Sequence, residues 1–159
     1  MHRGQRQIAV IGAGQCTEDV RVLAEEVGAE IARHGAALVC GGLAGVMEAA
    51  ARGAHHHGGL TIGVLPSYDR ETANQNIDIV IPTGFGHGRN IIVVASGDAV
   101  IALPGEHGTA SEIAFALLLG RPVVAVGAWH DHDAILHADS AGQAVETALQ
   151  AIGRQPRDR

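Results

Sequence analysis

The sequence predicts an α/β fold, in which a single domain forms a parallel sheet with helices on both faces. Short apolar runs rich in Val, Ile and Ala alternate with longer segments of helical periodicity, as in chains built from strand–helix–strand units. Aromatic residues make up only 3% of the 159 residues, so the core must consist of small and branched side chains, which suits helices packed on a parallel sheet. A domain of this length buries roughly 70% of its unfolded surface and needs no disulfide or metal to fold.

Six runs of β-branched and small apolar residues predict the strands, because each run is short and bounded by Gly, Pro or polar residues. The runs are almost continuously apolar, which is typical of strands covered on both faces. Connections that carry a helix between successive strands require parallel pairing with right-handed crossovers. The predicted strands span residues 7–12, 36–40, 60–65, 78–81, 98–103 and 122–126.

The predicted helices occupy the segments between these strands. The first begins at Thr17, a suitable N-cap, continues with the acids Glu18 and Asp19, and ends at Gly35. Apolar positions at helical spacing predict the others, and a polar loop is expected at 67–76. The predicted helices span residues 17–34, 43–57, 89–95, 109–119 and 143–152.

Charge and composition exclude several classes of protein. The net charge is −6 and there is no basic run, so nucleic acid and anionic membranes are poor partners. No segment has the layout of a signal peptide or the apolar length to span a bilayer. The two cysteines do not suggest a disulfide framework, so we expect a reducing, cytoplasmic location. We assign residues 1–153 to one nucleotide- or anion-binding domain and 154–159 to a polar, frayed tail.

Lysine is absent from the chain, and all eleven basic residues are arginines. This excludes a pyridoxal phosphate Schiff base, and so a lysine decarboxylase that depends on one. It also excludes a phosphate-loop NTPase, which needs its lysine. NAD is disfavoured because the turn after the first strand has Gly12 and Gly14 but lacks the third glycine of a dinucleotide fingerprint, where Thr17 stands.

Residues 104–112, Pro-Gly-Glu-His-Gly-Thr-Ala-Ser-Glu, predict an anion-binding site. A buried strand ends here in a glycine-containing turn, and we expect a helix to start at or near Thr109 and Ser111. Glycine permits close approach of the backbone to a ligand, and a helix N-terminus offers free N–H groups and the positive end of the dipole. Arg89 and Asn90 can add positive charge. The alternative is a capped helix after a tight turn, without a ligand.

Residues 104–112 resemble the PGGxGTxxE motif of the LONELY GUY (LOG) family, Rossmann-like proteins formerly mislabelled as lysine decarboxylases. Residues 40–47 resemble the GGxxGxM turn of that family, 58–66 its GGxxxGxxP strand, and 88–90 its arginine motif. The stretches follow the family order over about residues 8–126. The chain is most similar to the short bacterial branch, which also resembles molybdenum cofactor carrier proteins.

The resemblance implies a Rossmann-like domain that binds a phosphorylated, nucleotide-like small molecule. One function it implies is a binder or carrier, for example of molybdenum cofactor. The other is a nucleotide 5′-monophosphate phosphoribohydrolase that releases the base and ribose 5-phosphate, with Arg89 and Glu112 in catalysis. Neither requires a resident cofactor, and a nucleotide monophosphate or molybdenum cofactor is the expected ligand. The predicted ligand-binding residues are Gly12, Gly14, Gly41, Gly42, Arg89, Asn90, Gly105, Glu106, His107, Gly108 and Thr109.

Glu106 departs from the family motif, which has glycine at this position. A carboxylate at the edge of an anion site repels phosphate unless it points outward or is protonated. This departure favours the carrier. Arg89 and Glu112, which could pair in the crevice, favour the hydrolase.

The segment before the terminal helix is rich in histidine. His130, His132 and His137, with Asp131 and Asp133, lack a recognised zinc spacing. We therefore predict no metal site and expect a polar loop here.

The resemblance also implies a homodimer or homotetramer. The sequence supports this because the helix that contains residues 113–119 is apolar on more than one face. One face covers the sheet, and we expect the other to be buried against a second copy of the chain.

Overall fold

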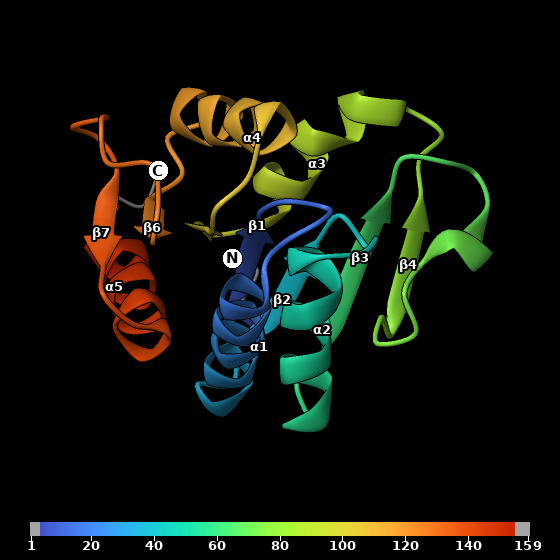
Figure 1. The fold of residues 1–159 in the computed structure, drawn as a ribbon, viewed down its shortest axis with the longest axis horizontal. Helices are drawn as coiled ribbons and strands as arrows, with labels where there is room; N and C mark the ends of the chain where they lie inside the picture. Colours follow the sequence, from blue (N-terminus) through green and yellow to red (C-terminus); the bar gives the residue numbers. More distant parts are fainter. Residues whose placement is uncertain (1–3, 155–159) are drawn as a thin grey trace.

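The computed structural model describes residues 4–154, which form a seven-stranded sheet with helices on both faces (Figure 1). The strand order is β4-β3-β2-β1-β5-β6-β7, and every neighbouring pair is parallel. The predicted single-domain, Rossmann-like α/β fold is therefore confirmed. The strands are β1 (Gln7–Ile11), β2 (Ala37–Cys40), β3 (Thr61–Leu65), β4 (Ile79–Pro82), β5 (Ala99–Ala102), β6 (Val123–Val126) and β7 (Leu136–Ala138).

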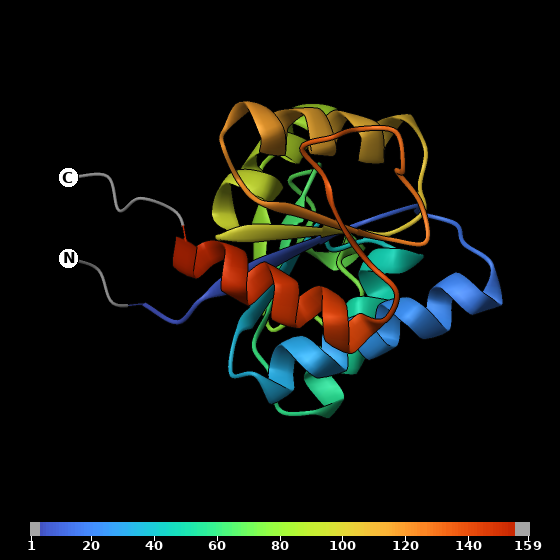
Figure 2. The same ribbon diagram turned by 90° about the vertical axis from the view of Figure 1, so that its left-hand side faces the viewer.

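The helices lie in two layers on opposite sides of the sheet (Figure 2). One layer contains α1 (Glu18–Arg33), α2 (Val46–His56) and α5 (Ala141–Arg154). The other contains α3 (Arg89–Ser96) and α4 (His107–Leu118). Two short 3-10 helices, η1 (Arg70–Thr72) and η2 (Gly86–Gly88), lie before and after β4.

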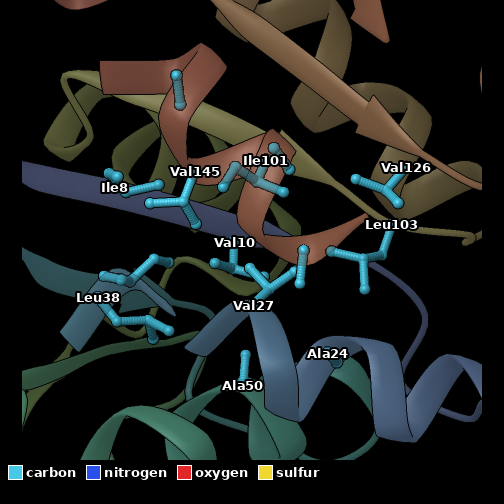
Figure 3. Close-up of a cluster of buried hydrophobic side chains, with 14 of the residues drawn as sticks. Ile8, Val10, Ala24, Val27, Leu38, Ala50, Ile101, Leu103, Val126 and Val145 are labelled. Carbon is cyan, nitrogen blue, oxygen red and sulfur yellow. The ribbon is translucent and has the colours of Figure 1, made fainter. Parts of the chain in front are cut away.

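Alternate residues of the central strands point into two separate apolar cores. In β1, Ile8 and Val10 face the layer of α1, α2 and α5, where Val27 joins them (Figure 3). Ala9 and Ile11 face the layer of α3 and α4. Side chains alternate between the faces of a strand, so a strand covered on both faces is apolar at every position. This explains why the strands appear in the sequence as continuous apolar runs.

The predicted start of α1 is confirmed. Thr17 is the N-cap, and its hydroxyl accepts a hydrogen bond from the backbone N–H of Val20 at 3.5 Å. Glu18 and Asp19 lie in the first turn, where negative charge is favourable. Gly35, with φ of 71°, follows the last turn as predicted.

The strand order places a topological switch point between β1 and β5. The chain builds outward from β1 to β4, and β5 then returns to lie on the other side of β1. Helix α1 follows β1 on one face, whereas α4 follows β5 on the opposite face. The two connections diverge at the carboxyl ends of these strands, which is where ligands bind in sheets of this type.

Several elements differ from the sequence prediction, among them β7, α4 and α5. The expected loop before the terminal helix contains β7, an edge strand of three residues in which Leu136 and His137 are exposed, so no buried apolar run marks it. Helix α4 starts at His107 rather than near Thr109. Helix α5 runs to Arg154, which the sequence prediction had assigned to the tail, and residues 155–159 lie outside the described residues.

The predicted polar loop at 67–76 is ordered by a short helix and by hydrogen bonds. It contains η1, and the side-chain amide of Asn74 donates to the carbonyl oxygens of Gly42 at 3.3 Å and Leu43 at 2.8 Å. These bonds hold the loop against the turn that follows β2. Within residues 4–154, no helix has the length and apolar character needed to cross a membrane.

Candidate functional site

Three turns that follow β1, β2 and β5 meet at the carboxyl edge of the sheet. The backbone N–H of Ala13, after β1, donates to the carbonyl of Pro104, after β5, at 3.0 Å. The carbonyl of Ala13 in turn accepts from the N–H of Val46, at the start of α2, also at 3.0 Å. The three glycine-containing turns therefore converge, as the sequence predicted.

The turns enclose a cavity of about 360 Å³ at the switch point. Nine of the predicted ligand-binding or catalytic residues line this cavity. Six further residues that the sequence did not indicate also line it. The predicted residues are Gly12, Gly14, Gly41, Arg89, Asn90, Glu106, Gly108, Thr109 and Glu112. The unpredicted ones are Val10, Ile11, Ala13, Gln15, Met47 and His87.

Three of the predicted residues do not line this cavity, namely Gly42, Gly105 and His107. A Cβ on Gly105 would lie 2.1 Å from Oγ1 of Thr109, so this glycine lets the turn close onto the helix. Gly42, with φ of 75°, shapes the turn after β2. Of the missed residues, Met47 lies within the motif at 40–47 and His87 directly precedes the motif at 88–90, so proximity to those motifs was the available signal.

The N-terminus of α4 presents unpaired backbone donors. The first intrahelical bond runs from the N–H of Ala110 to the carbonyl of Glu106 at 2.9 Å. The preceding N–H groups, of His107, Gly108 and Thr109, have no acceptor among the described residues. Glu106 is the N-cap, but its side chain caps no N–H group. Such an end combines free donors with the positive end of the helix dipole.

Thr109 and Ser111 do not cap α4, contrary to the expectation that the helix starts there. Thr109 is the third helical residue and is 4% exposed. Ser111 lies further along the helix and donates its hydroxyl to the carbonyl of Gly108 at 2.6 Å. A hydroxyl that bonds back to the preceding turn cannot cap the helix, which leaves the terminal N–H groups open.

Arg89 brings a buried positive charge to the cavity. Arg89 is 8% exposed. Its Nη1 donates to Oδ1 of Asn90, and its Nη2 donates to the carbonyl of Gly41 at 3.5 Å. A Cβ on Gly41 would lie 2.6 Å from Nη2, so a larger residue here would displace the guanidinium from this position. Nε is buried and has no partner among the described residues. Burial lowers the pKa of Arg89, which reflects the cost of holding this charge.

Glu112 brings a buried carboxyl group to the same cavity. It is 7% exposed, and its carboxyl oxygens accept no hydrogen bond from the described residues. Burial raises its pKa to about 7, and attraction to Arg89 opposes this rise. Arg89 and Glu112 form no ion pair within 4.0 Å among the described residues, so the direct pairing considered from the sequence is not present.

Glu106 lies at the rim of the cavity. Its residue is exposed and its side chain makes no hydrogen bond or ion pair within residues 4–154. At 4 Å, two unit charges repel by about 4 kcal/mol at an effective dielectric constant of 20 but by only about 1 kcal/mol in water. An exposed carboxylate is closer to the second case, so its effect on a phosphate is smaller than a buried position would give.

The histidines near β7 lie outside this cavity. The rings of His130 and His137 stack with centroids 5.3 Å apart. Within residues 4–154, no group of three or more His, Cys, Asp or Glu side chains is arranged to hold a metal ion. Cys40 lies close to Arg89, but burial raises the pKa of its thiol to about 12, so it is inert at neutral pH.

Two solved structures of similar proteins share the whole architecture of the chain. The molybdenum cofactor binding protein of the phototrophic bacterium Rippkaea orientalis is 34% identical, with a TM-score of 0.90, over 95% of this chain and 99% of that one. The Moco carrier protein of Chlamydomonas reinhardtii is 35% identical, with a TM-score of 0.87, over 96% and 100% of the two chains.

A relative with an enzymatic name is also similar to the chain. The cytokinin riboside 5′-monophosphate phosphoribohydrolase of Mycobacterium tuberculosis is 37% identical over 142 residues, which are 83% of this chain and 76% of that protein. Residues 5–152 match the SLOG cluster4 family. The similarity to LOG-type phosphoribohydrolases and to Moco carrier proteins predicted from the motifs is therefore confirmed, and the chain belongs to the SLOG cluster4 family.

Proposed function

We propose that the chain binds a phosphorylated, nucleotide-like small molecule in the cavity between the carboxyl ends of β1 and β5. The observation that carries this proposal is the Arg89 guanidinium, which is buried beside the open N-terminus of α4 and whose Nε has no partner within residues 4–154. A buried cation without a close counter-ion is costly, and a bound phosphate would offset that cost. The three unpaired N–H groups of α4 would complete its coordination.

We propose further that the protein holds this ligand as a carrier and that molybdenum cofactor, which has a terminal phosphate, is the first ligand to test. Two proteins with the same architecture are named as a binder and a carrier of this cofactor. The cavity of about 360 Å³ is at the small end of the range for ligand pockets, which suits one compact ligand rather than a dinucleotide.

Native mass spectrometry of the protein as purified tests this proposal, followed by calorimetric titration with AMP, GMP and molybdenum cofactor. A retained mass that Arg89→Ala loses, or binding that Arg89→Ala weakens, supports it. If none of these ligands binds the unliganded wild-type protein, the cavity is not the phosphate site proposed here.

A second function, hydrolysis of a nucleotide 5′-monophosphate to the base and ribose 5-phosphate, is favoured by Glu112. Its carboxyl lines the cavity without a hydrogen-bond partner among the described residues, and burial raises its pKa to about 7. A carboxyl group titrating near neutrality can act as a general acid or base, and its anion can stabilise the positive charge that develops on the ribose. A relative that carries this activity in its name is 37% identical to the chain.

Release of free base from nucleoside monophosphates distinguishes the two functions. Wild-type turnover that Glu112→Gln abolishes, with binding retained, establishes the hydrolase. Tight binding without turnover in either protein establishes the carrier.

We also propose that the protein forms a homodimer through α3 and α4. Their only Arg, Lys, Asp or Glu residues are Arg89 and Glu112, and both are buried. Leu118 is 78% exposed on this surface. The chain carries a net charge of −6, so a surface free of exposed charge is where two copies can meet without repulsion. Light scattering should give twice the mass of 16.4 kDa or more, and Leu118→Asp should restore the monomer mass.

We propose a cytoplasmic location, which the free thiols of Cys16 and Cys40 support because a reducing compartment preserves them. Thiol titration of protein purified from the native cell should find both reduced after denaturation.

A further inference from the structure

A chain of hydrogen bonds connects the Arg89 guanidinium to the first turn of α4. Nη1 of Arg89 donates to Oδ1 of Asn90. Nδ2 of Asn90 donates to Oγ of Ser111 at 3.1 Å, and that hydroxyl donates to the carbonyl of Gly108 at 2.6 Å. Asn90 is 3% exposed. These three hydrogen bonds thus link the starts of α3 and α4, which both border the cavity.

The direction of every bond in this chain is determined by the chemistry of Arg89. A guanidinium can only donate, so the atom of Asn90 that faces it must be the carbonyl oxygen. The amide nitrogen of Asn90 then points toward Ser111 and needs an acceptor. The hydroxyl of Ser111 accepts this bond with a lone pair and sends its single proton to Gly108. No member of the chain can reverse its role without leaving two donors face to face.

Ser111 is therefore the residue that joins the arginine to the helix N-terminus. We propose that Ser111 is a positioning residue: through Asn90 it sets the orientation of the Arg89 guanidinium relative to the open N–H groups of α4. The effect on ligand binding rests on the proposed phosphate-binding function, in which the Arg89 guanidinium and the N–H groups of α4 must point at one phosphate at the same time. Without Ser111, the amide of Asn90 loses its acceptor, and only the bond from Arg89 itself still holds its oxygen.

Ser96 provides a matched control for Ser111. Its hydroxyl also donates to a carbonyl of the preceding helical turn, that of Ile92, at 2.7 Å, but it lies at the exposed C-terminal end of α3. Ser96→Ala removes the same kind of bond without touching the chain of Arg89, Asn90 and Ser111. Ser111→Thr keeps the hydroxyl and serves as the rescue variant.

The first measurement needs no ligand. Proton–nitrogen NMR of the guanidinium groups, with the Arg89 signal assigned from Arg89→Ala, follows the exchange of the Arg89 Nε–H with water. Ser111→Ala should accelerate this exchange roughly fivefold or more, the change expected for one lost hydrogen bond. Ser96→Ala and Ser111→Thr should leave it as in the wild-type protein. Equal exchange rates in Ser111→Ala and Ser96→Ala would overturn the proposal.

The second measurement is a double-mutant cycle with AMP as the probe. Ser111→Ala should weaken AMP binding roughly 5- to 20-fold, and Ser111→Thr should restore most of it. In the Arg89→Ala background, Ser111→Ala should have no further effect, since there is no guanidinium left to orient. An equal effect in both backgrounds would show that Ser111 acts independently of Arg89. A wild-type protein that binds no AMP counts against the proposed function, and the exchange measurement alone then decides the role of Ser111.

Discussion

Helices α1 and α4 begin in similar places in the fold, but their N-termini differ in capping and in charge. Both follow glycine-containing turns after neighbouring central strands, β1 and β5. At α1, Thr17 caps the helix and Glu18 and Asp19 add negative charge to the first turn. At α4, no side chain caps the helix and the first turn has no acidic residue.

The difference shows how one fold can contain both a capped helix N-terminus and one that is open to an anion. At α1, the hydroxyl of Thr17 accepts from one N–H group and two carboxylates add negative charge, so this helix start disfavours an anion. The start of α4 has three N–H groups with no acceptor in the described part of the chain, beside a buried arginine, and a bound anion would stabilise this arrangement. Substitutions at and around the two helix starts test this contrast.

Arg89→Ala should weaken binding of a phosphorylated ligand such as AMP by roughly 1.5–3 kcal/mol, because it removes the charged donors beside α4. Calorimetry measures the affinity. Arg70→Ala is the control, since Arg70 is exposed and donates to the carbonyl of Val80 on the edge strand. Unchanged affinity in Arg89→Ala would show that the buried arginine does not make the N-terminus of α4 an anion site.

Glu112→Gln should stabilise the fold at neutral and alkaline pH. The folded-state pKa of Glu112, about 7, lies above its ordinary value of 4.5, so the folded protein binds the proton more tightly than the unfolded chain. The penalty for burying this group is therefore absent below about pH 4.5, grows between those values and is complete above pH 7.

Chemical unfolding at several pH values measures this effect. We expect the free energy of unfolding of Glu112→Gln to exceed that of the wild type by about 2 kcal/mol above neutrality, and the two proteins to converge in acid. Glu146→Gln, an exposed change on α5, should show no such pH dependence. A gain of equal size in acid would mean that charge burial is not its cause.

Thr17→Ala should lower the free energy of unfolding by about 1 kcal/mol, the usual cost of losing an N-cap, and should leave AMP affinity unchanged. Thermal or chemical unfolding and calorimetry of the same variant check the two halves. Loss of affinity together with stability would mean that the end of α1 also serves the ligand.

Glu106→Gln should tighten binding of a phosphorylated ligand only about two- to fivefold, because the carboxylate is exposed at the rim of the cavity. The gain should disappear at high salt, which screens exposed charges. Titrations at low and high ionic strength measure it. A much larger gain that persists in salt would show that Glu106 turns into the cavity when a ligand binds.

The sequence allowed the parallel α/β fold and the meeting of its turns to be predicted because both depend on local patterns. A continuous apolar run marks a strand covered on both faces, and Thr17 with its following acids marks a helix start. Gly12, Gly41 and Gly105 each follow such a strand, and the carboxyl ends of parallel strands share one edge. The short edge strand β7 has no apolar run and was missed for that reason.

Tertiary structure alone decided which strands are neighbours and what the charged residues experience. β5 lies beside β1 although about ninety residues separate them, because packing rather than local pattern selects the partner of a strand. The burial of Arg89 and Glu112 comes from elements scattered along the chain, so their shifted pKa values could not follow from residue type. The same holds for Ser111: the sequence placed it near a helix start, but only the fold brought it to Asn90, where its hydroxyl bonds the side chain that orients Arg89.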